Sequence, residues 1–408
     1  MADKITNKLL IIFLLSFGTY PLIPERQESL VVVFLVIISF WIFFRKKDKA
    51  SFNVLNFLLP ISIFLIFLLS ATLSDDVSKG FRRIETMFSL LIIPLVFHVL
   101  LYGHKINLMS VKKIFFKIYY ISNIVYCFFA INVFNNYKNP KYIYKDSNFF
   151  RNALIDVPLI GEHPIYISVF LAIAILIGFT LYNLKNKVIN NVFIGLGQSF
   201  ILIILILLMS KSVILALFLS GVVWVLLKYK KRIYILSFLL FILISIILFI
   251  PKSNNRLKDL FDKVSYTQLD LNNSTSMRIS ILKCNIDLIS KNPLFGYGLG
   301  DVQQEMDDCY ASNGYDFFKG QYNTHNQYFF VWLSCGILGL LVFFAFLYYY
   351  YRIAILNRDY LMLSILVLYS VVFMFENILS RQSGVIFFSF LISFMSIIGV
   401  KNKESNFT

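Results

Sequence analysis

Long apolar runs follow one another along almost the whole chain, separated by short polar segments. A run of about 20 apolar residues is long enough to cross a lipid bilayer as a helix. Hydrophobic residues make up 58% of the 408 positions and charged residues only 15%, whereas soluble domains carry about 25% charged residues. The pattern predicts an all-α integral membrane protein and excludes a soluble globular domain.

The apolar runs predict about twelve transmembrane helices and one large loop. Nine helices are expected within residues 1–250, a loop with short helices over 251–327, and three more helices within 328–408. The predicted spans lie near residues 8–24, 29–44, 54–73, 86–102, 115–133, 164–183, 191–209, 212–227, 233–250, 328–350, 360–376 and 384–400.

The positive charge follows this topology. Short segments on one side of the predicted membrane, such as 45–53 and 228–232, together account for the whole net charge of +16, whereas the segments on the other side are balanced. Loops rich in Lys and Arg stay in the cytoplasm during insertion. We therefore expect both termini in the cytoplasm and the large loop outside. Because insertion and anionic lipids explain the basic segments, no nucleic-acid partner is expected.

The large loop contains a predicted amphipathic helix over residues 274–290. Its expected apolar face carries Ile279, Leu282, Ile286 and Ile289. Cys284 and Cys309 both fall on the outer side, where an oxidising compartment would permit a disulfide. The sequence alone does not pair them.

The segment NPLFGYGLGD at 292–301 is expected to end that helix. Three glycines stand at alternate positions, Gly296, Gly298 and Gly300. Such glycines permit backbone torsions or close approaches that a side chain would forbid. A nucleotide-binding fingerprint is excluded, because the spacing is not GxGxxG and no strand is predicted before it.

Unusual polar residues collect on the outer side, at places far apart in the chain. They are Arg82, Arg83, His163, Tyr166, Lys211, Arg278, His325, Glu376 and Arg381. Each has a structural alternative. Arginines can anchor at the interface, His163 and Tyr166 can cap or pack at a helix start, and Glu376 can pair locally with Arg381. Their combination at one interface favours a functional site.

Several cations beside one imidazole suit a particular reaction. Guanidinium and ammonium groups bind a diphosphate and stabilise charge on a departing oxygen. An imidazole suits removal of a proton from a hydroxyl nucleophile. Lys211 lies between two apolar runs near membrane depth, where a charge is costly and usually functional. The four histidines are scattered, at 98, 104, 163 and 325, so we expect no metal site.

Four stretches resemble the O-antigen ligase and polymerase superfamily of bacterial membrane glycosyltransferases. They are RISILKCNIDLISKNPLFGYGLGD, HNQYFFVWLSCGILGL, the earlier SKSVILAL and the later ENILSRQSGVIFF. The resemblance covers the C-terminal half, including a glycine at 336, eleven residues beyond His325. Lys211 stands where members often carry arginine, and Ser334 where many carry glutamate.

The resemblance implies a fold of about a dozen transmembrane helices with one large periplasmic loop in the bacterial inner membrane. It implies transfer of a glycan from undecaprenyl diphosphate to an acceptor hydroxyl without a metal or nucleotide cofactor. His325 would be the base, with Arg278, Lys211 and Arg83 binding the diphosphate. Supporting residues would be Arg82, Glu376, Arg381, Tyr322 and Asn326. Direct displacement would invert the anomeric configuration.

The residues leave the acceptor open. A ligase would use the lipid A core oligosaccharide, a polymerase another lipid-linked glycan, and a third variant a protein hydroxyl. A transporter for lipid-linked sugars is a different class that twelve spans fit equally well. Against a transporter, the polar residues gather at one leaflet, whereas carriers place them near the midplane in two related halves.

Overall fold

The structure is a computed structural model that describes residues 8, 11–12, 14–45, 54–103, 108–137, 148–155, 162–182, 188–228 and 274–404. In chain order the helices are η1 (Phe17–Leu22), α2 (Glu25–Arg45), α3 (Val54–Thr72), α4 (Val77–Met87), α5 (Ser89–Gly103), α6 (Leu108–Tyr137), α7 (Asn148–Ile155), α8 (Pro164–Leu181), α9 (Val188–Leu207), α10 (Lys211–Lys228), α14 (Ser274–Lys291), α15 (Val302–Ser312), η3 (Asp316–Phe318), α16 (Gln327–Leu356), α17 (Tyr360–Val372), η4 (Ile378–Ser380) and α18 (Gln382–Glu404).

All regular structure in these residues is helical, with no strand among them. Within the described residues, five helices are long and apolar enough to cross a membrane: α6, α8, α9, α10 and α16. Shorter apolar helices lie within α3, α17 and α18. The chain is therefore an all-helical membrane protein, as the sequence predicts. The total of twelve spans stays a prediction, and the expected span at 233–250 lies outside the described residues.

One predicted span differs from its expected form. Residues 8–24 were expected to cross the membrane as one helix, but residues Phe17–Leu22 form the 3₁₀ helix η1. Pro21 lies inside it and has no N–H to continue an α-helical ladder. The Tyr20 hydroxyl instead donates to the Ser383 carbonyl at the start of α18, 3.0 Å away. This segment is therefore tied to the core rather than continuing as a regular helix.

The core of the bundle lies around α8 and α18. Residues 164–178 and 383–395 are buried without interruption, because other helices surround both segments. Aromatic rings join them to η1. Phe170 and Phe387 meet edge to face at 5.0 Å, and Phe17 stacks on Phe390 at 3.8 Å. This packed centre fixes the start of α8 and the start of α18, and both starts contribute to the site described below.

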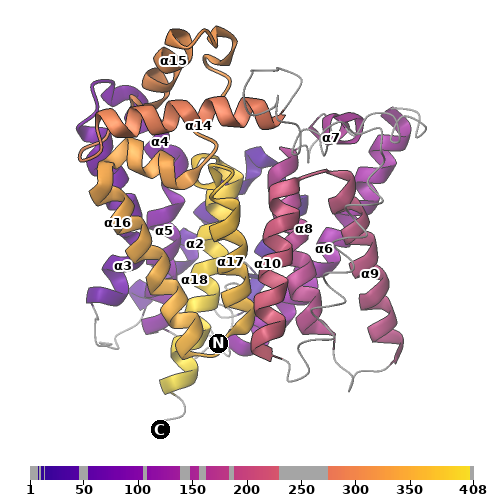
Figure 1. The fold of residues 1–408 in the computed structure, drawn as a ribbon. Coiled ribbons are helices and arrows are strands. Elements are labelled where there is room, and N and C mark those ends of the chain that lie inside the picture. Colours follow the sequence, from indigo (N-terminus) through magenta and orange to yellow (C-terminus); the bar gives the residue numbers. More distant parts are fainter. Residues whose placement is uncertain are drawn as a thin grey trace.

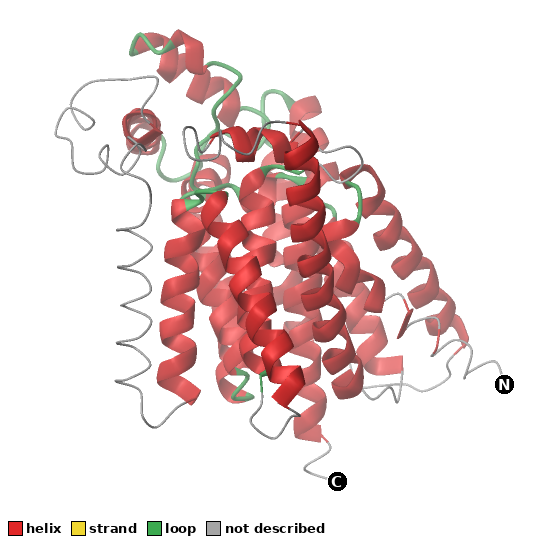
Figure 2. Ribbon diagram, turned by 90° about the vertical axis from the view of Figure 1, so that its right-hand side faces the viewer, coloured by secondary structure: helices red, strands yellow, loops and turns green. Residues whose placement is uncertain are grey.

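Helices outside the upright bundle gather at one of its ends, here called the loop end (Figures 1 and 2). Figure 1 shows α14 lying across this end, α15 beyond it, and α4 and α7 beside it. The predicted helix at 274–290 is confirmed and ends at Lys291. Its expected face is wrong, since Leu282 and Ile286 are exposed while Ile281 and Leu288 are buried. Packing on α15 and α16 sets the rotation of α14.

A disulfide joins Cys284 of α14 to Cys309 of α15. The cysteines are 25 positions apart in the sequence. The bond holds the helix that carries Arg278 against the helix that carries Gln303. The pairing that the sequence left open is thus assigned.

The glycine-rich segment at 292–301 inserts into a kink of α16. Gly336 has φ +66° and ψ −169° inside that helix, and a Cβ there would collide with the Leu294 carbonyl oxygen. The Tyr297 N–H donates to the freed Leu333 carbonyl at 2.6 Å. The close approaches expected of this segment are therefore confirmed, and one of them depends on a glycine in another helix.

The same segment also holds the start of α4. The Asp301 carboxylate accepts hydrogen bonds from the backbone N–H groups of Asp75 and Asp76, at 2.7 and 2.9 Å. The Gly300 N–H donates to the Ser74 hydroxyl at 2.9 Å. These contacts fix α4, which carries Arg82 and Arg83, relative to α15 and α16.

Candidate active site

Two short loops meet at the loop end and carry the candidate site. The first, residues 323–326, precedes α16, and the second, residues 373–377, joins α17 to η4. The Gln327 side-chain oxygen accepts from the Leu379 N–H at 2.9 Å, and the Gln327 backbone N–H donates to the Phe373 carbonyl at 2.8 Å. These buried bonds hold the two loops in a fixed relationship.

The two loops place His325 and Glu376 against each other. Nδ1 of His325 lies 3.2 Å from Oε2 of Glu376. Oε1 of the same carboxylate accepts from Nη2 of Arg278 on α14 at 3.0 Å. Glu376 is buried, whereas the Arg278 side chain is 42% exposed. One carboxylate therefore joins the expected base to the expected phosphate ligand. The sequence also allowed a local ion pair between Glu376 and Arg381, but Glu376 pairs with Arg278 and His325 instead.

His325 has an unusual backbone, with φ +44°. A non-glycine residue in this region is strained by about 1–3 kcal/mol and persists only where its surroundings hold it. The His325 backbone is held in this conformation because its N–H donates to the Asn323 side-chain oxygen at 2.9 Å. Thr324 before it bonds the Asn377 side chain, and Asn326 after it donates to the Met374 carbonyl. The ring is therefore aimed by its flanking residues.

A second imidazole, His163, stands near this cluster. It caps α8, with Nδ1 accepting from the Ile165 N–H at 3.5 Å. Burial, with the positive charge of Arg381, lowers the pKa of His163 to about 4. The charges of Glu376, Arg151 and His325 also act on it. The capping role considered for His163 is thus confirmed, and it stays neutral beside the cluster.

Arg381 and Tyr166 lie on the same side. The Arg381 guanidinium stands over the Tyr166 ring at 6.0 Å from its centre, and the His163 ring meets Tyr166 edge to face at 6.0 Å. Arg381 is exposed, so this contact leaves its donors available at the surface. Tyr166 is buried and contacts both Arg381 and His163.

Lys211 is the first residue of α10, whose N-terminal end lies at the loop end (Figure 1). The turn before it is held from two sides. The Arg151 guanidinium of α7 donates to the Leu208 carbonyl at 2.7 Å, and the hydroxyls of Ser168 and Ser210 bond at 2.7 Å. Lys211 thus lies at the same end of the molecule as Arg278 and His325, on a turn fixed by α7 and α8.

The other two predicted cations face a different hollow. Arg83 lines a pocket of about 170 Å³ together with Gln303, Asn323 and Asn377. It also lines an adjoining pocket of about 310 Å³, which Arg82 borders as well. Arg83 therefore lies beside the loops that carry His325 and Glu376, without joining their ion pairs.

Residues 196–344 match the family described as O-antigen ligase. The matched part contains Lys211, Arg278 and His325, whereas Glu376 lies beyond it. The resemblance noted in the sequence is thereby confirmed. This part of the chain is similar to O-antigen ligases, in agreement with the superfamily that the sequence resembles. No curated protein sequence matches it.

Two further residues expected to support the site of this O-antigen ligase-like protein have defined positions. Asn326 caps α16, since its side chain accepts from the Phe329 N–H at 3.1 Å. The Tyr322 ring lies beside His325, with ring centres 6.0 Å apart. Asn326 therefore orients the loop, whereas Tyr322 borders the imidazole directly.

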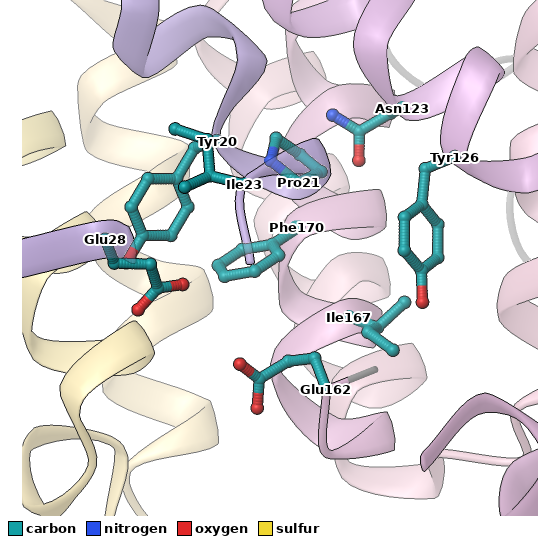
Figure 3. A pocket seen from close by; sticks show the side chains of 9 residues that line it. All are labelled: Tyr20, Pro21, Ile23, Glu28, Asn123, Tyr126, Glu162, Ile167 and Phe170. Carbon is teal, nitrogen blue, oxygen red and sulfur yellow. The ribbon is translucent and has the colours of Figure 1, made fainter. Parts of the chain in front are cut away.

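A separate small cavity lies within the helix bundle, near Glu162 (Figure 3). Figure 3 shows Glu28 and Glu162 reaching into it from different parts of the chain. Its volume is about 10 Å³, which is room for about one water molecule. Buried atoms of Glu28, Asn123 and Tyr126 there have no hydrogen-bond partner. The cavity is too small for a sugar and is not the substrate site.

Sequence reasoning did not find every contributor to this O-antigen ligase-like site. Arg151 was missed because the segment around it gave no motif. Asn377 and Gln327 were missed because each is a single polar residue at the edge of an apolar run. A polar amide beside an apolar run was the signal that could have identified them, because burying an amide is costly unless its hydrogen bonds are satisfied. Among the described residues, no group of three or more His, Cys, Asp or Glu side chains could hold a metal ion.

Proposed function

We propose that this protein is a membrane glycosyltransferase that moves a glycan from undecaprenyl diphosphate to an acceptor hydroxyl, with His325 as the base. The single observation that carries the proposal is the Glu376 carboxylate, which contacts both His325 and Arg278. Attack on a diphosphate-linked carbon needs a base for the acceptor hydroxyl and a cation for the leaving group, and this carboxylate holds one candidate for each role.

The contact with Glu376 supports one assignment of the ring nitrogens in this proposal. Nδ1 faces the carboxylate and is the donor to it, so Nε2 is the nitrogen that accepts a proton. The carboxylate fixes the tautomer and stabilises the imidazolium that forms. Nε2 removes the proton as the acceptor oxygen attacks.

Arg278 and Lys211 bind the diphosphate in this proposal. Arg278 donates to Glu376 through Nη2. Because its side chain is partly exposed, its other N–H donors remain for phosphate oxygens. Lys211 adds a point charge. As the bond between the anomeric carbon and the diphosphate oxygen breaks, these cations stabilise the charge on that oxygen.

The step is balanced. One carbon–oxygen bond to the diphosphate breaks, one carbon–oxygen bond to the acceptor forms, and the acceptor proton moves to His325 and then to solvent. Attack opposite to the leaving group inverts the anomeric configuration. A retained configuration in the product, or a covalent glycosyl-enzyme adduct, contradicts this mechanism.

We place the site on the periplasmic face of a bacterial inner membrane, with about twelve spans and both termini in the cytoplasm. The charge asymmetry of the loops supports this orientation. The disulfide between Cys284 and Cys309 supports it independently, because disulfides persist in oxidising compartments. A tag at either terminus should be protected from protease in intact spheroplasts.

The experiment that tests the activity uses purified protein in detergent with a synthetic undecaprenyl-diphosphate-linked glycan and an acceptor. We expect release of undecaprenyl diphosphate without any membrane gradient. No release in detergent, together with movement of the lipid across a proteoliposome membrane, would identify a transporter instead. The glycan that accumulates on the lipid carrier in a deletion strain distinguishes a ligase from a polymerase. Loss of a ligase leaves long chains, whereas loss of a polymerase leaves single repeats.

A further inference from the structure

Two neighbouring pockets beside Arg83 are together called the basic cleft here. They adjoin, because Arg83 and Gln303 line both of them. The inner pocket reaches Asn323 and Asn377, which neighbour His325 and Glu376 in the sequence. The outer pocket lies between α4 and α15, is about 310 Å³ in volume and is bordered by Lys79, Arg82, Gln304 and Asp307.

Two guanidinium groups in the basic cleft lack an anion. Neither Arg82 nor Arg83 forms an ion pair with a carboxylate in the described part of the chain. Arg83 is largely buried, its Nη1 has no hydrogen-bond partner, and its guanidinium stands 5.7 Å from the centre of the Phe330 ring. Burial lowers the pKa of Arg83, although Asp301 opposes this. Lys79, by contrast, is paired with Asp76 at 2.9 Å.

The opposite wall of the basic cleft carries amides. The Gln303 amide nitrogen donates to Asp307 and to the Tyr322 carbonyl, and the Gln304 nitrogen donates to Asp308. The amide oxygens are left as acceptors for hydroxyl groups. Asp307 is the one carboxylate in the lining, and its Oδ1 already accepts from Gln303 and from the Gly320 N–H.

The basic cleft faces the loop side rather than the lipid side. Its far wall is α15, which lies beyond α14 at the loop end, away from the upright helices (Figure 1). Interfacial anchoring therefore does not account for Arg83, because an anchoring arginine extends toward headgroups, whereas this one packs over Phe330 inside the cleft.

We infer that the basic cleft is a glycan subsite that binds a sugar carrying an acidic group, either a carboxylate or a phosphate. Arg82 and Arg83 would hold the acidic group with paired N–H donors, and the Gln303 and Gln304 oxygens would accept from sugar hydroxyls. This inference rests on the proposed glycosyl transfer and separates Arg83 from the diphosphate, to which Arg278 and Lys211 are assigned. The cleft selects which glycan is presented to His325.

The test measures equilibrium binding by calorimetry to the purified full-length protein in detergent. Glucuronate and glucose 6-phosphate are the acidic probes, glucose is the neutral probe, and pyrophosphate reports on the diphosphate site. The variants are Arg82→Gln, the double variant Arg82→Gln with Arg83→Gln, and Arg278→Gln. Lys283→Gln, an exposed charge on α14 outside both sites, is the matched control.

We expect the wild type to bind at least one acidic probe at least tenfold more tightly than glucose. The double variant should lose this preference while keeping pyrophosphate binding, and Arg278→Gln should do the reverse. Arg82→Gln alone, at an exposed position that leaves the packing of Arg83 intact, should weaken the acidic probe several-fold. Lys283→Gln should change neither.

Four results would overturn the inference. They are equal binding of glucose and both acids, no binding of any sugar, an unchanged preference in the double variant, and loss of pyrophosphate binding in the double variant alone. The last would make the basic cleft the diphosphate site. Failure of the proposed function is distinguishable, because it would show as absent glycan transfer with acidic-sugar binding intact.

Discussion

Arg278 and Glu376 form an ion pair of 3.0 Å although they lie on α14 and on the loop after α17. If Glu376 acts by orienting His325 and Arg278, Glu376→Gln should lower kcat by about 10²-fold or more, the range of general-base effects, and change KM less. Asp287→Asn, an exposed carboxylate change on α14, is the control.

A role through His325 also predicts non-additivity. In a His325→Asn background, Glu376→Gln should cause a smaller loss than in the wild type, because only its contact with Arg278 remains to be removed. Additive losses in single-turnover assays would show that Glu376 acts without His325, for instance only on folding. Arg278→Lys should also be poorly tolerated, since lysine has no second fork nitrogen for the phosphate.

Much of the helix layout could be predicted, because apolar periodicity and length decide it locally. The start of α14 and its end before Asn292 followed from the same signals. The rotation of α14 about its axis could not be predicted. Ile281 and Leu288 are buried by α15 and α16, and the local sequence pattern does not encode these contacts. The site likewise depended on pairings across the chain, so Glu376 could be suspected but its two partners could not be identified.

The kink in α16 supplies a prediction about folding. Gly336→Ala should destabilise the protein strongly, because alanine at φ +66° is strained and its Cβ would collide with the Leu294 carbonyl. Gly314→Ala is the control for backbone strain alone, because Gly314 has φ +74° and open space around its Cβ position. Gly221→Ala is the control without strain or collision, and it should be neutral or stabilising because this helical position also has open space. The measurement is Tm in detergent. Equal Tm values for the variants at 336 and 314 would show that the insertion of segment 292–301 is dispensable.

The disulfide between α14 and α15 supplies a prediction about stability and activity. Replacing both Cys284 and Cys309 by serine should cost about 3 kcal/mol of stability, the value expected for closing a loop of this length. Glycan transfer should fall as well, because α14 carries Arg278. Reducing agent should lower the Tm of the wild type and leave that of the double variant unchanged. A wild type insensitive to reductant would mean that the bond does not contribute to stability.

His163 predicts a pH dependence of stability. Its pKa is lowered from 6.5 to about 4 in the folded protein, first by burial and then by Arg381. The unfolded chain therefore takes up a proton first as the pH falls from about 6.5, which favours unfolding down to about pH 4. The loss is at most about 3 kcal/mol. His163→Asn keeps a side-chain acceptor at the helix cap and should flatten this part of the Tm curve. Parallel curves for the two proteins would contradict the prediction.

The most direct test of the central claim is the single-turnover rate of glycan transfer by purified His325→Asn, compared with the wild type, with donor binding measured in parallel. Asparagine tolerates the left-handed backbone at this position but cannot act as the base. The account predicts donor binding within a few-fold of the wild type and transfer reduced by about 10²–10⁴-fold. Transfer at a near-normal rate with the donor bound would contradict it.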